Sequence, residues 1–186
     1  MNANENKVQF GLEKLYYALI TVTNGEETFG TPKAIPGAVS LSMDAETGET
    51  TFYADNIKYY VSKTNNGYSG SIELAKVPEE MWEDVYGVTV DATDKVMIEK
   101  TTDVIKEIAL LFEFSGDKNK NNCVLYRCVL GRPSISHETT EDSNEPQTVS
   151  IDYEALPLSD GKVRATTTSQ TDATVKSDWY SSVYTG

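Results

Sequence analysis

Residues 30–75 read GTPKAIPGAVSLSMDAETGETTFYADNIKYYVSKTNNGYSGSIELA, and this stretch combines strand patterns, turn residues and a long polar segment. Its second half predicts a hairpin, because residues 59–61 lead into Asn65–Gly67, which tolerate the left-handed backbone of a tight turn. Apolar and polar side chains then alternate over residues 68–75, so we expect a strand with one buried face. The first half predicts a long polar loop at about 43–58, since it is too polar to bury and too long for a simple turn.

Strand patterns separated by turn residues recur along the rest of the chain. The predicted strands are 15–23, 96–98, 107–114, 123–130, 148–155 and 163–168. Residues 108–112 are almost continuously apolar, so we expect that strand to be buried on both faces. The spacing predicts a mainly β protein, either a β-sandwich or a partly closed barrel, formed by residues 1–186 as a single domain.

One covering α-helix is expected at about 78–86. Pro78 suits the first helical position, Glu79 and Glu80 suit the positive end of the helix dipole, and Gly87 can end the helix. Aromatic residues at helical spacing predict a second, short helix near 177–183.

Composition argues against several classes of function. The formal net charge is -13, whereas proteins that grip nucleic acid neutralise phosphates with lysine and arginine. The longest apolar run, residues 15–22, is far shorter than the roughly 20 residues that span a bilayer. The amino-terminal residues have neither the cationic start nor the apolar stretch of a signal peptide, so we expect a cytoplasmic protein without membrane contact.

The residues that usually carry chemistry are few. Cys123 and Cys128 lie five residues apart in one predicted strand, so we expect them on opposite faces, about 16 Å apart and unable to pair. The single histidine, His137, lies in a polar stretch and gives no basis for a metal site. The acidic clusters look solvated, and no phosphate loop, nucleophile elbow or zinc-binding histidine pair is present. We therefore expect no enzymatic activity, no metal and no cofactor.

Several distinctive stretches follow one another along nearly the whole chain. They are GTPKAIPGAVSLSMD, TFYADNIKYY, NNGYSGSIELA, LLFEFSGD (110–117), EPQT (145–148) and SDWYSSVY (177–184). In this order they resemble the phi13-type family of major tail proteins from long-tailed bacteriophages and their prophages. The resemblance implies a tail tube subunit whose copies form hexameric rings that stack into a hollow tube for DNA passage. It further implies location in the virion tail after synthesis in the host cytoplasm, with tape measure and tail terminator proteins as further partners.

A tube subunit needs surfaces that contact other copies, and two segments are candidates. One is an amino-terminal arm at about 1–12, and the other is the polar segment at about 43–58, where amphipathic aromatic residues of the kind enriched at interfaces gather. The candidate interface residues are Val8, Phe10, Asp44, Glu46, Glu49, Phe52, Tyr53, Asp55 and Tyr59.

The acidity of the chain suits a DNA conduit, because an acidic wall repels phosphates and lets DNA pass without specific binding. Glu73, Asp152 and Glu154 alternate away from the apolar side of their predicted strands, so they are the candidate acids of the channel lining. The same pattern would arise if these residues faced outer solvent.

Three alternatives remain open from the sequence. A carbohydrate-binding or adhesin-type β-sandwich would place exposed aromatic residues over a shallow groove and stay monomeric. A tail terminator or a distal tail protein would form a single ring and not a polymer.

Overall fold

The computed structural model describes residues 11–114, 120–135 and 147–186 of the chain. Within these residues the protein is mainly β, with two short helices. The strands are β1 (Leu12–Thr23), β2 (Glu26–Phe29), β3 (Lys33–Ala34), β4 (Ala38–Leu41), β5 (Asp44–Ala54), β6 (Ile57–Leu74), β7 (Thr89–Val90), β8 (Met97–Ile98), β9 (Ile108–Phe114), β10 (Asn122–Leu130), β11 (Val149–Leu156) and β12 (Arg164–Thr166). The helices are α1 (Glu79–Asp84) and α2 (Ala173–Asp178). Each strand predicted outside the opening stretch overlaps an observed strand.

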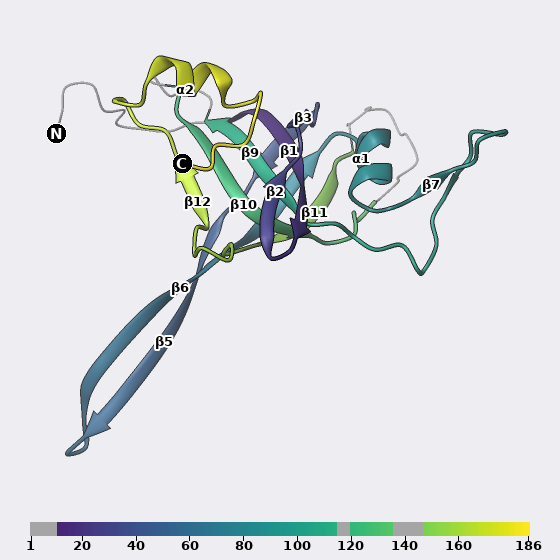
Figure 1. Ribbon diagram of the computed structural model, residues 1–186. Helices are drawn as coiled ribbons and strands as arrows, with labels where there is room; N and C mark the ends of the chain where they lie inside the picture. Colours follow the sequence, from purple (N-terminus) through teal and green to yellow (C-terminus); the bar gives the residue numbers. More distant parts are fainter. Residues whose placement is uncertain (1–10, 115–119, 136–146) are drawn as a thin grey trace, which may run out of the picture.

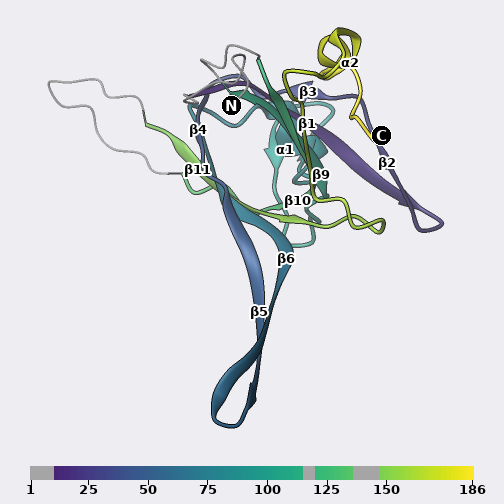
Figure 2. The ribbon, with the colours of Figure 1, turned by 90° about the vertical axis from the view of Figure 1, so that its left-hand side faces the viewer.

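One antiparallel sheet of ten strands organises the molecule, in the order β2-β1-β9-β10-β11-β6-β4. Outside this path, β3 pairs with β1, β12 with β10 and β5 with β6, while β7 and β8 form a separate small sheet. The sheet curves around an apolar core without closing into a barrel, so the predicted β-sandwich class is confirmed. β5 and β6 project together far beyond this body (Figure 1 and Figure 2), and the chain around β7 projects in a different direction (Figure 1).

Apolar side chains cover both faces of the central strand β9. Ile108, Leu110 and Phe112 join the larger core, where they meet residues of β1, β6, β10 and β11. Ala109 and Leu111 point to a second, smaller cluster on the other face. The predicted burial of this strand on both faces is therefore confirmed.

Each core is completed by a segment outside the sheet. Met81 and Val85, from α1 and the residue after it, are fully buried in the larger core, which confirms α1 as a covering helix. Gly87 follows with φ of 71°, a left-handed conformation that ends the helix at little cost. The smaller cluster is covered by Trp179 and Val183 of the carboxy-terminal segment. The helix α2 ends before these residues, so the expected helix at 177–183 was placed too late.

The hairpin turn predicted at Asn65–Gly67 was wrong. β6 runs through these residues as one continuous strand, and the turn lies at Asp55 and Asn56, with φ of 51° and 63°. Two central residues with positive φ are typical of the type I′ turn that suits a two-residue hairpin. The polar segment at about 43–58 is accordingly a strand and a turn, not a loop.

The residues Asn65–Gly67 have a different role in the hairpin. Glu46 lies opposite Gly67 and Thr47 lies opposite Asn65, so Asn66 is an extra residue on β6. This is a β-bulge, and Gly67 supports it with φ of 115°. The preference of these residues for left-handed backbone is therefore satisfied by a bulge and not by a turn, because β5 and β6 continue to pair on both sides of Asn66.

The two cysteines lie on the same side of the sheet, contrary to expectation. Both Cys123 and Cys128 belong to the larger core. Between Leu125 and Cys128 the register with β9 shifts by one residue, which reverses the alternation of β10. Both cysteines are buried free thiols, so the expectation that they do not pair with each other is confirmed.

Candidate assembly surface

The hairpin of β5 and β6 is the most exposed large feature of the described chain. β5 pairs with β6 from Asp44 to the turn, whereas β11 pairs with β6 only as far as Tyr68. Beyond Tyr68 the hairpin therefore has two strands and two open edges. An isolated two-stranded hairpin is marginally stable in water, and open edges favour pairing with another chain.

Large apolar side chains gather near the tip of this hairpin. Their exposed fractions are 59% for Phe52, 60% for Tyr53, 62% for Ile57, 72% for Tyr59, 59% for Tyr60 and 45% for Val61. Phe52 lies directly opposite Tyr60, so these two rings share one face of the hairpin, while Thr51 and Val61 share the other. Both faces near the tip are thus partly apolar. We call these six residues the tip cluster.

The base of the hairpin is held by close backbone contacts that need glycine. A Cβ atom on Gly70 would lie 2.1 Å from the Ser42 carbonyl oxygen, and one on Gly67 would lie 2.0 Å from the Ala155 carbonyl oxygen. The hydroxyl of Tyr153 donates a hydrogen bond of 2.8 Å to the same Ser42 oxygen. These contacts fix the point at which the hairpin leaves the sheet.

The three candidate channel acids lie on one face of the sheet. In the β6–β11 pairing, Glu73 is opposite Ser150, Asp152 is opposite Ser71 and Glu154 is opposite Ser69. Directly opposed residues of an antiparallel pair point to the same side. The alternate residues, among them Ile72 and Ile151, are buried in the core. We call this outward side, formed by Ser69, Ser71, Glu73, Ser150, Asp152 and Glu154, the serine-acid face.

Further polar side chains extend the serine-acid face toward the hairpin. Ser40 donates a hydrogen bond of 2.9 Å to Glu73, and Ser69 donates one of 2.5 Å to Glu46. Asp44 lies opposite Ser69 and so belongs to the same side. The face is open, with a hollow of about 610 Å³ lined in part by Asp44 and Asp152.

The structure brings most of the predicted interface residues together. Asp44, Glu46, Glu49, Phe52, Tyr53, Asp55 and Tyr59 are all exposed on the hairpin. Val8 and Phe10 lie outside the described residues, as does His137. The sequence analysis did not single out Ile57 and Val61, although Ile57 lies in the predicted polar segment at about 43–58 and Val61 in the stretch that leads into the predicted turn. Tyr68 has a different role, since it is half-buried at the hairpin base with the Arg164 guanidinium 5.1 Å from its ring centre.

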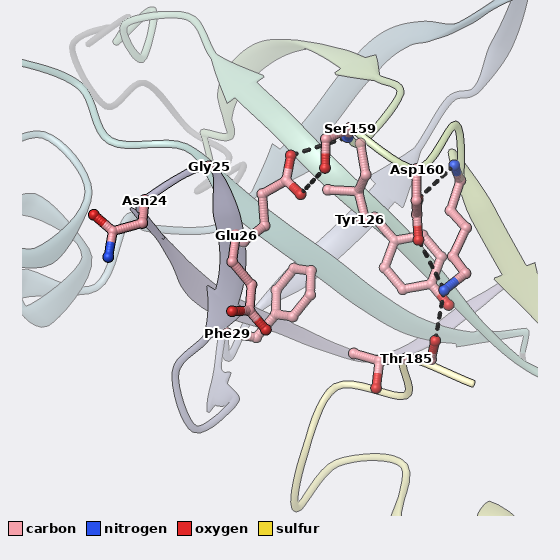
Figure 3. A pocket seen from close by; sticks show the side chains of 11 residues that line it. Asn24, Gly25, Glu26, Phe29, Tyr126, Ser159, Asp160 and Thr185 are labelled. Carbon is pink, nitrogen blue, oxygen red and sulfur yellow. Dashed lines mark hydrogen bonds and ion pairs between the residues drawn. The ribbon is translucent and has the colours of Figure 1, made fainter.

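A second surface feature lies at the far end of the sheet, beside the edge strand β2. It is a hollow of about 360 Å³ (Figure 3), in which Phe29, Tyr126 and Leu158 supply apolar walls. Burial raises the pKa of Tyr126 to about 12.

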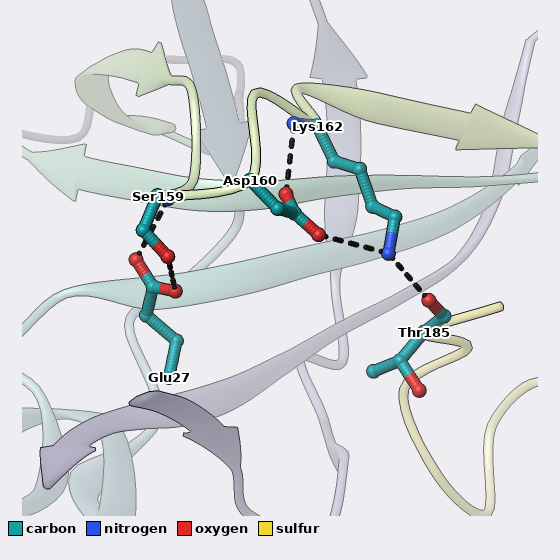
Figure 4. Close-up of polar contacts among 5 residues, drawn as sticks. All are labelled: Glu27, Ser159, Asp160, Lys162 and Thr185. Carbon is teal, nitrogen blue, oxygen red and sulfur yellow. Dashed lines mark hydrogen bonds and ion pairs between the residues drawn. The ribbon is translucent and has the colours of Figure 1, made fainter. Parts of the chain in front are cut away.

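Polar contacts tie the rim of this hollow together (Figure 4). The Ser159 backbone N–H and hydroxyl donate hydrogen bonds of 3.0 and 2.5 Å to the two oxygens of Glu27, and they hold the pKa of that carboxyl below its ordinary value. Lys162 Nζ lies 2.9 Å from Asp160 Oδ2 and donates to the Thr185 carbonyl at 2.8 Å. The loop before β12 and the carboxy-terminal segment are thus fixed next to β2.

Among the residues that the structure describes, no group of three or more histidine, cysteine, aspartate or glutamate side chains is arranged to hold a metal ion. Neither described helix has the length and apolar character needed to cross a membrane.

Comparison with known proteins gives likenesses in fold but not in sequence. No protein-family profile matches the sequence, and no curated protein matches it. Among solved structures, the fold is similar to the anti-feeding prophage cap, described as a tube terminating cap, with 11% sequence identity and a TM-score of 0.49 over 90% of this chain and 98% of that one. A likeness at this level does not decide what this chain does.

Proposed function

We propose that this chain is a structural subunit of a bacteriophage-type tail tube, which polymerises as stacked hexameric rings into a hollow tube for DNA passage. The observation that carries the proposal is the β5–β6 hairpin, with its open edges and its exposed tip cluster. A projecting apolar surface of this kind marks an interaction site. In an assembly its aromatic side chains would be covered and its edges would pair with neighbouring chains.

A second copy of the same chain is the partner that best fits this hairpin. The sequence stretches that resemble the phi13-type major tail proteins include both strands of the hairpin, and that family assembles from identical subunits. The tip cluster and the body that would receive it lie on different parts of one chain, so the contact is head-to-tail. Head-to-tail contacts generate closed rings or open filaments, which are the two elements of a stacked tube.

The serine-acid face supports a channel lining. It carries Glu73, Asp152 and Glu154, and Asp44 and Glu46 continue it toward the hairpin. Serine hydroxyls and carboxylates turned toward duplex DNA would repel the phosphates without offering a cation to bind them. We propose that this face lines the channel and that DNA passes it without specific binding.

The remaining parts of the proposal follow from a tube in a virion. The subunit is made in the host cytoplasm and resides in the virion tail, where it contacts tape measure and terminator proteins. It has no enzymatic activity and needs no cofactor or metal.

Shortening the hairpin tests the proposal. Residues 50–62 are removed and Glu49 is joined to its partner Lys63 through Asn-Gly, which suits a type I′ turn. The shortened protein should keep its β circular dichroism spectrum and should form no tubes in negative-stain electron microscopy. Tubes of normal length from this variant would contradict the proposal.

A second pair of variants keeps the length of the hairpin. Replacing the opposed rings by Phe52→Ser with Tyr60→Ser should abolish assembly, because it removes the aromatic pair from one face of the tip. The matched control exchanges the polar pair, Thr50→Ser with Ser62→Thr, and should assemble as the original protein does.

Electron microscopy of the unmodified protein separates the alternative functions. Isolated rings indicate a terminator or distal tail protein, and a stable monomer that binds sugar indicates a carbohydrate-binding module.

A further inference from the structure

The outer side of β2 offers a second, distinct docking groove. β2 ends the sheet and pairs with β1 alone among the described strands, so its other edge presents free backbone donors and acceptors. Two hollows of about 360 and 310 Å³ adjoin this edge and share Glu27, Phe29 and Thr185 in their walls. Together they form a groove between β2 and the carboxy-terminal segment, which we call the β2 groove.

The chemistry of the β2 groove is specific enough to describe its ligand. Phe29 lies on one side of β2 and is directed toward Tyr126, with the two ring centres 6.1 Å apart. Glu26 and Thr28 point to the opposite side of the strand and are exposed. Glu27 lies on the same side as Phe29, but Ser159 donates hydrogen bonds to both of its carboxylate oxygens. An extended segment laid against β2 would therefore need an apolar residue beside Phe29 and a cation on the Glu26 side.

The amino-terminal arm has this pattern. In the sequence Lys7-Val8-Gln9-Phe10, the two apolar residues alternate with a lysine and a glutamine. In a strand, Val8 and Phe10 would share one face and Lys7 would point to the other. We propose that residues 7–10 of one copy add as a strand to β2 of a neighbouring copy, with Phe10 in the β2 groove and Lys7 beside Glu26.

The separation between the arm and β2 along β1 favours an arm from another copy. β1 begins at Leu12 and meets β2 at its other end, from Ile20 onward. The distance from Leu12 to Ile20 is roughly 27 Å along a strand that rises about 3.4 Å per residue. Phe10 is two residues from Leu12 and reaches only about 7 Å from it. The stretch of β2 around Phe29 therefore lies well beyond the reach of Phe10 measured along β1, which favours an arm supplied by a neighbouring copy.

This inference rests on the proposed self-assembly and adds a second contact to it. The hairpin would bind through the tip cluster at one part of the subunit, and the arm would bind at the opposite edge of the sheet. An arm that adds a strand to β2 also covers an edge that would otherwise invite non-specific pairing.

Disulfide trapping tests the arm in the full-length protein. One variant carries Gln9→Cys and a second carries Thr28→Cys, so a disulfide between them must join two copies. The native Cys123 and Cys128 are buried and should not compete. After oxidation of the mixed, assembled protein we expect a covalent dimer on a non-reducing gel, and none when Thr101→Cys replaces the groove variant as a matched exposed control. The absence of the dimer, or equal yields with the control, would overturn the inference.

Charge reversal in the same trapping experiment tests the proposed ion pair between Lys7 and Glu26. Lys7→Glu or Glu26→Lys should lower the yield of the trapped dimer by about fivefold, the upper range for an exposed ion pair, and the two together should restore it. The control Glu13→Lys, at the far end of β1, should leave the yield unchanged. Electron microscopy of the same samples separates the two proposals. Tubes without the trapped dimer would refute the arm contact only, whereas the absence of any assembly would refute both the arm contact and the proposed tube.

Discussion

Gly70 is the residue whose replacement most directly tests how the hairpin is anchored. An added Cβ atom would lie 2.1 Å from the Ser42 carbonyl oxygen, where ordinary contact begins at 3.4 Å, so the two backbones would have to separate by 3.4 - 2.1 = 1.3 Å. Overpacking of this kind costs roughly 1–3 kcal/mol. The same displacement would break the hydrogen bond from Tyr153 to that oxygen, which contributes roughly 0.5–1.5 kcal/mol. We therefore expect Gly70→Ala to lower the free energy of unfolding by roughly 2–4 kcal/mol.

Urea unfolding and calorimetry measure this loss, and the melting temperature should fall by roughly 5–15 °C for a chain of this length. Gly30→Ala is the matched control, because its Cβ would meet its nearest neighbour at 3.6 Å. Gly30→Ala should be neutral or stabilise by up to about 1 kcal/mol, since alanine restricts the unfolded chain. Tyr153→Phe isolates the hydrogen bond. If Gly70→Ala unfolds at the same urea concentration as Gly30→Ala, the close contact does not anchor the hairpin.

Three further predictions concern charge, pH and thiol reactivity. Substituting lysine for both Asp152 and Glu154 should leave assembly intact and create salt-sensitive DNA binding. Unchanged DNA ejection from virions that carry both lysines would show that these residues do not line the channel. Burial alone would raise the pKa of Asp84. Hydrogen bonds donated by Lys33 and Tyr17 to its carboxylate outweigh this effect, so the pKa of Asp84 is lowered. The charged Asp84 therefore stabilises the folded protein above the unfolded pKa of about 3.9, and this stabilisation is lost as the pH falls through the folded pKa. In the Asp84→Asn variant, acid unfolding curves should lack this loss of stability. Burial raises the pKa of both Cys123 and Cys128, so a maleimide should label neither in the folded protein and both in denaturant.

Periodicity predicted most of the strands because burial follows it closely. The alternation of Ile151 and Tyr153 with Asp152 and Glu154 is the alternation between core and surface in the folded sheet. The covering helix was predictable for a similar reason, since its start, its buried side and its stop are local features. These local features were therefore read correctly from the sequence, whereas the second helix was placed too late.

The other errors concern features that depend on the register between paired strands. Asn65–Gly67 and Asp55–Asn56 both tolerate left-handed backbone, and only the register between β5 and β6 decides which pair forms the turn. The faces of Cys123 and Cys128 depend likewise on an extra residue in β10 that is visible only against β9. Turn preference and strand alternation do not contain this information.

Register also connects the fold to the proposed function. A slip of one residue in β11 would turn Asp152 and Glu154 into the core and expose Ile151. The close contacts of Gly67 with Ala155 and of Gly70 with Ser42 hold β6 in place on both sides. The contacts that exclude carboxylates from the core therefore also keep the serine-acid face continuous from β11 to the hairpin. Substitutions at the two glycines should thus disturb stability and assembly together, whereas substitutions in the tip cluster should disturb assembly alone.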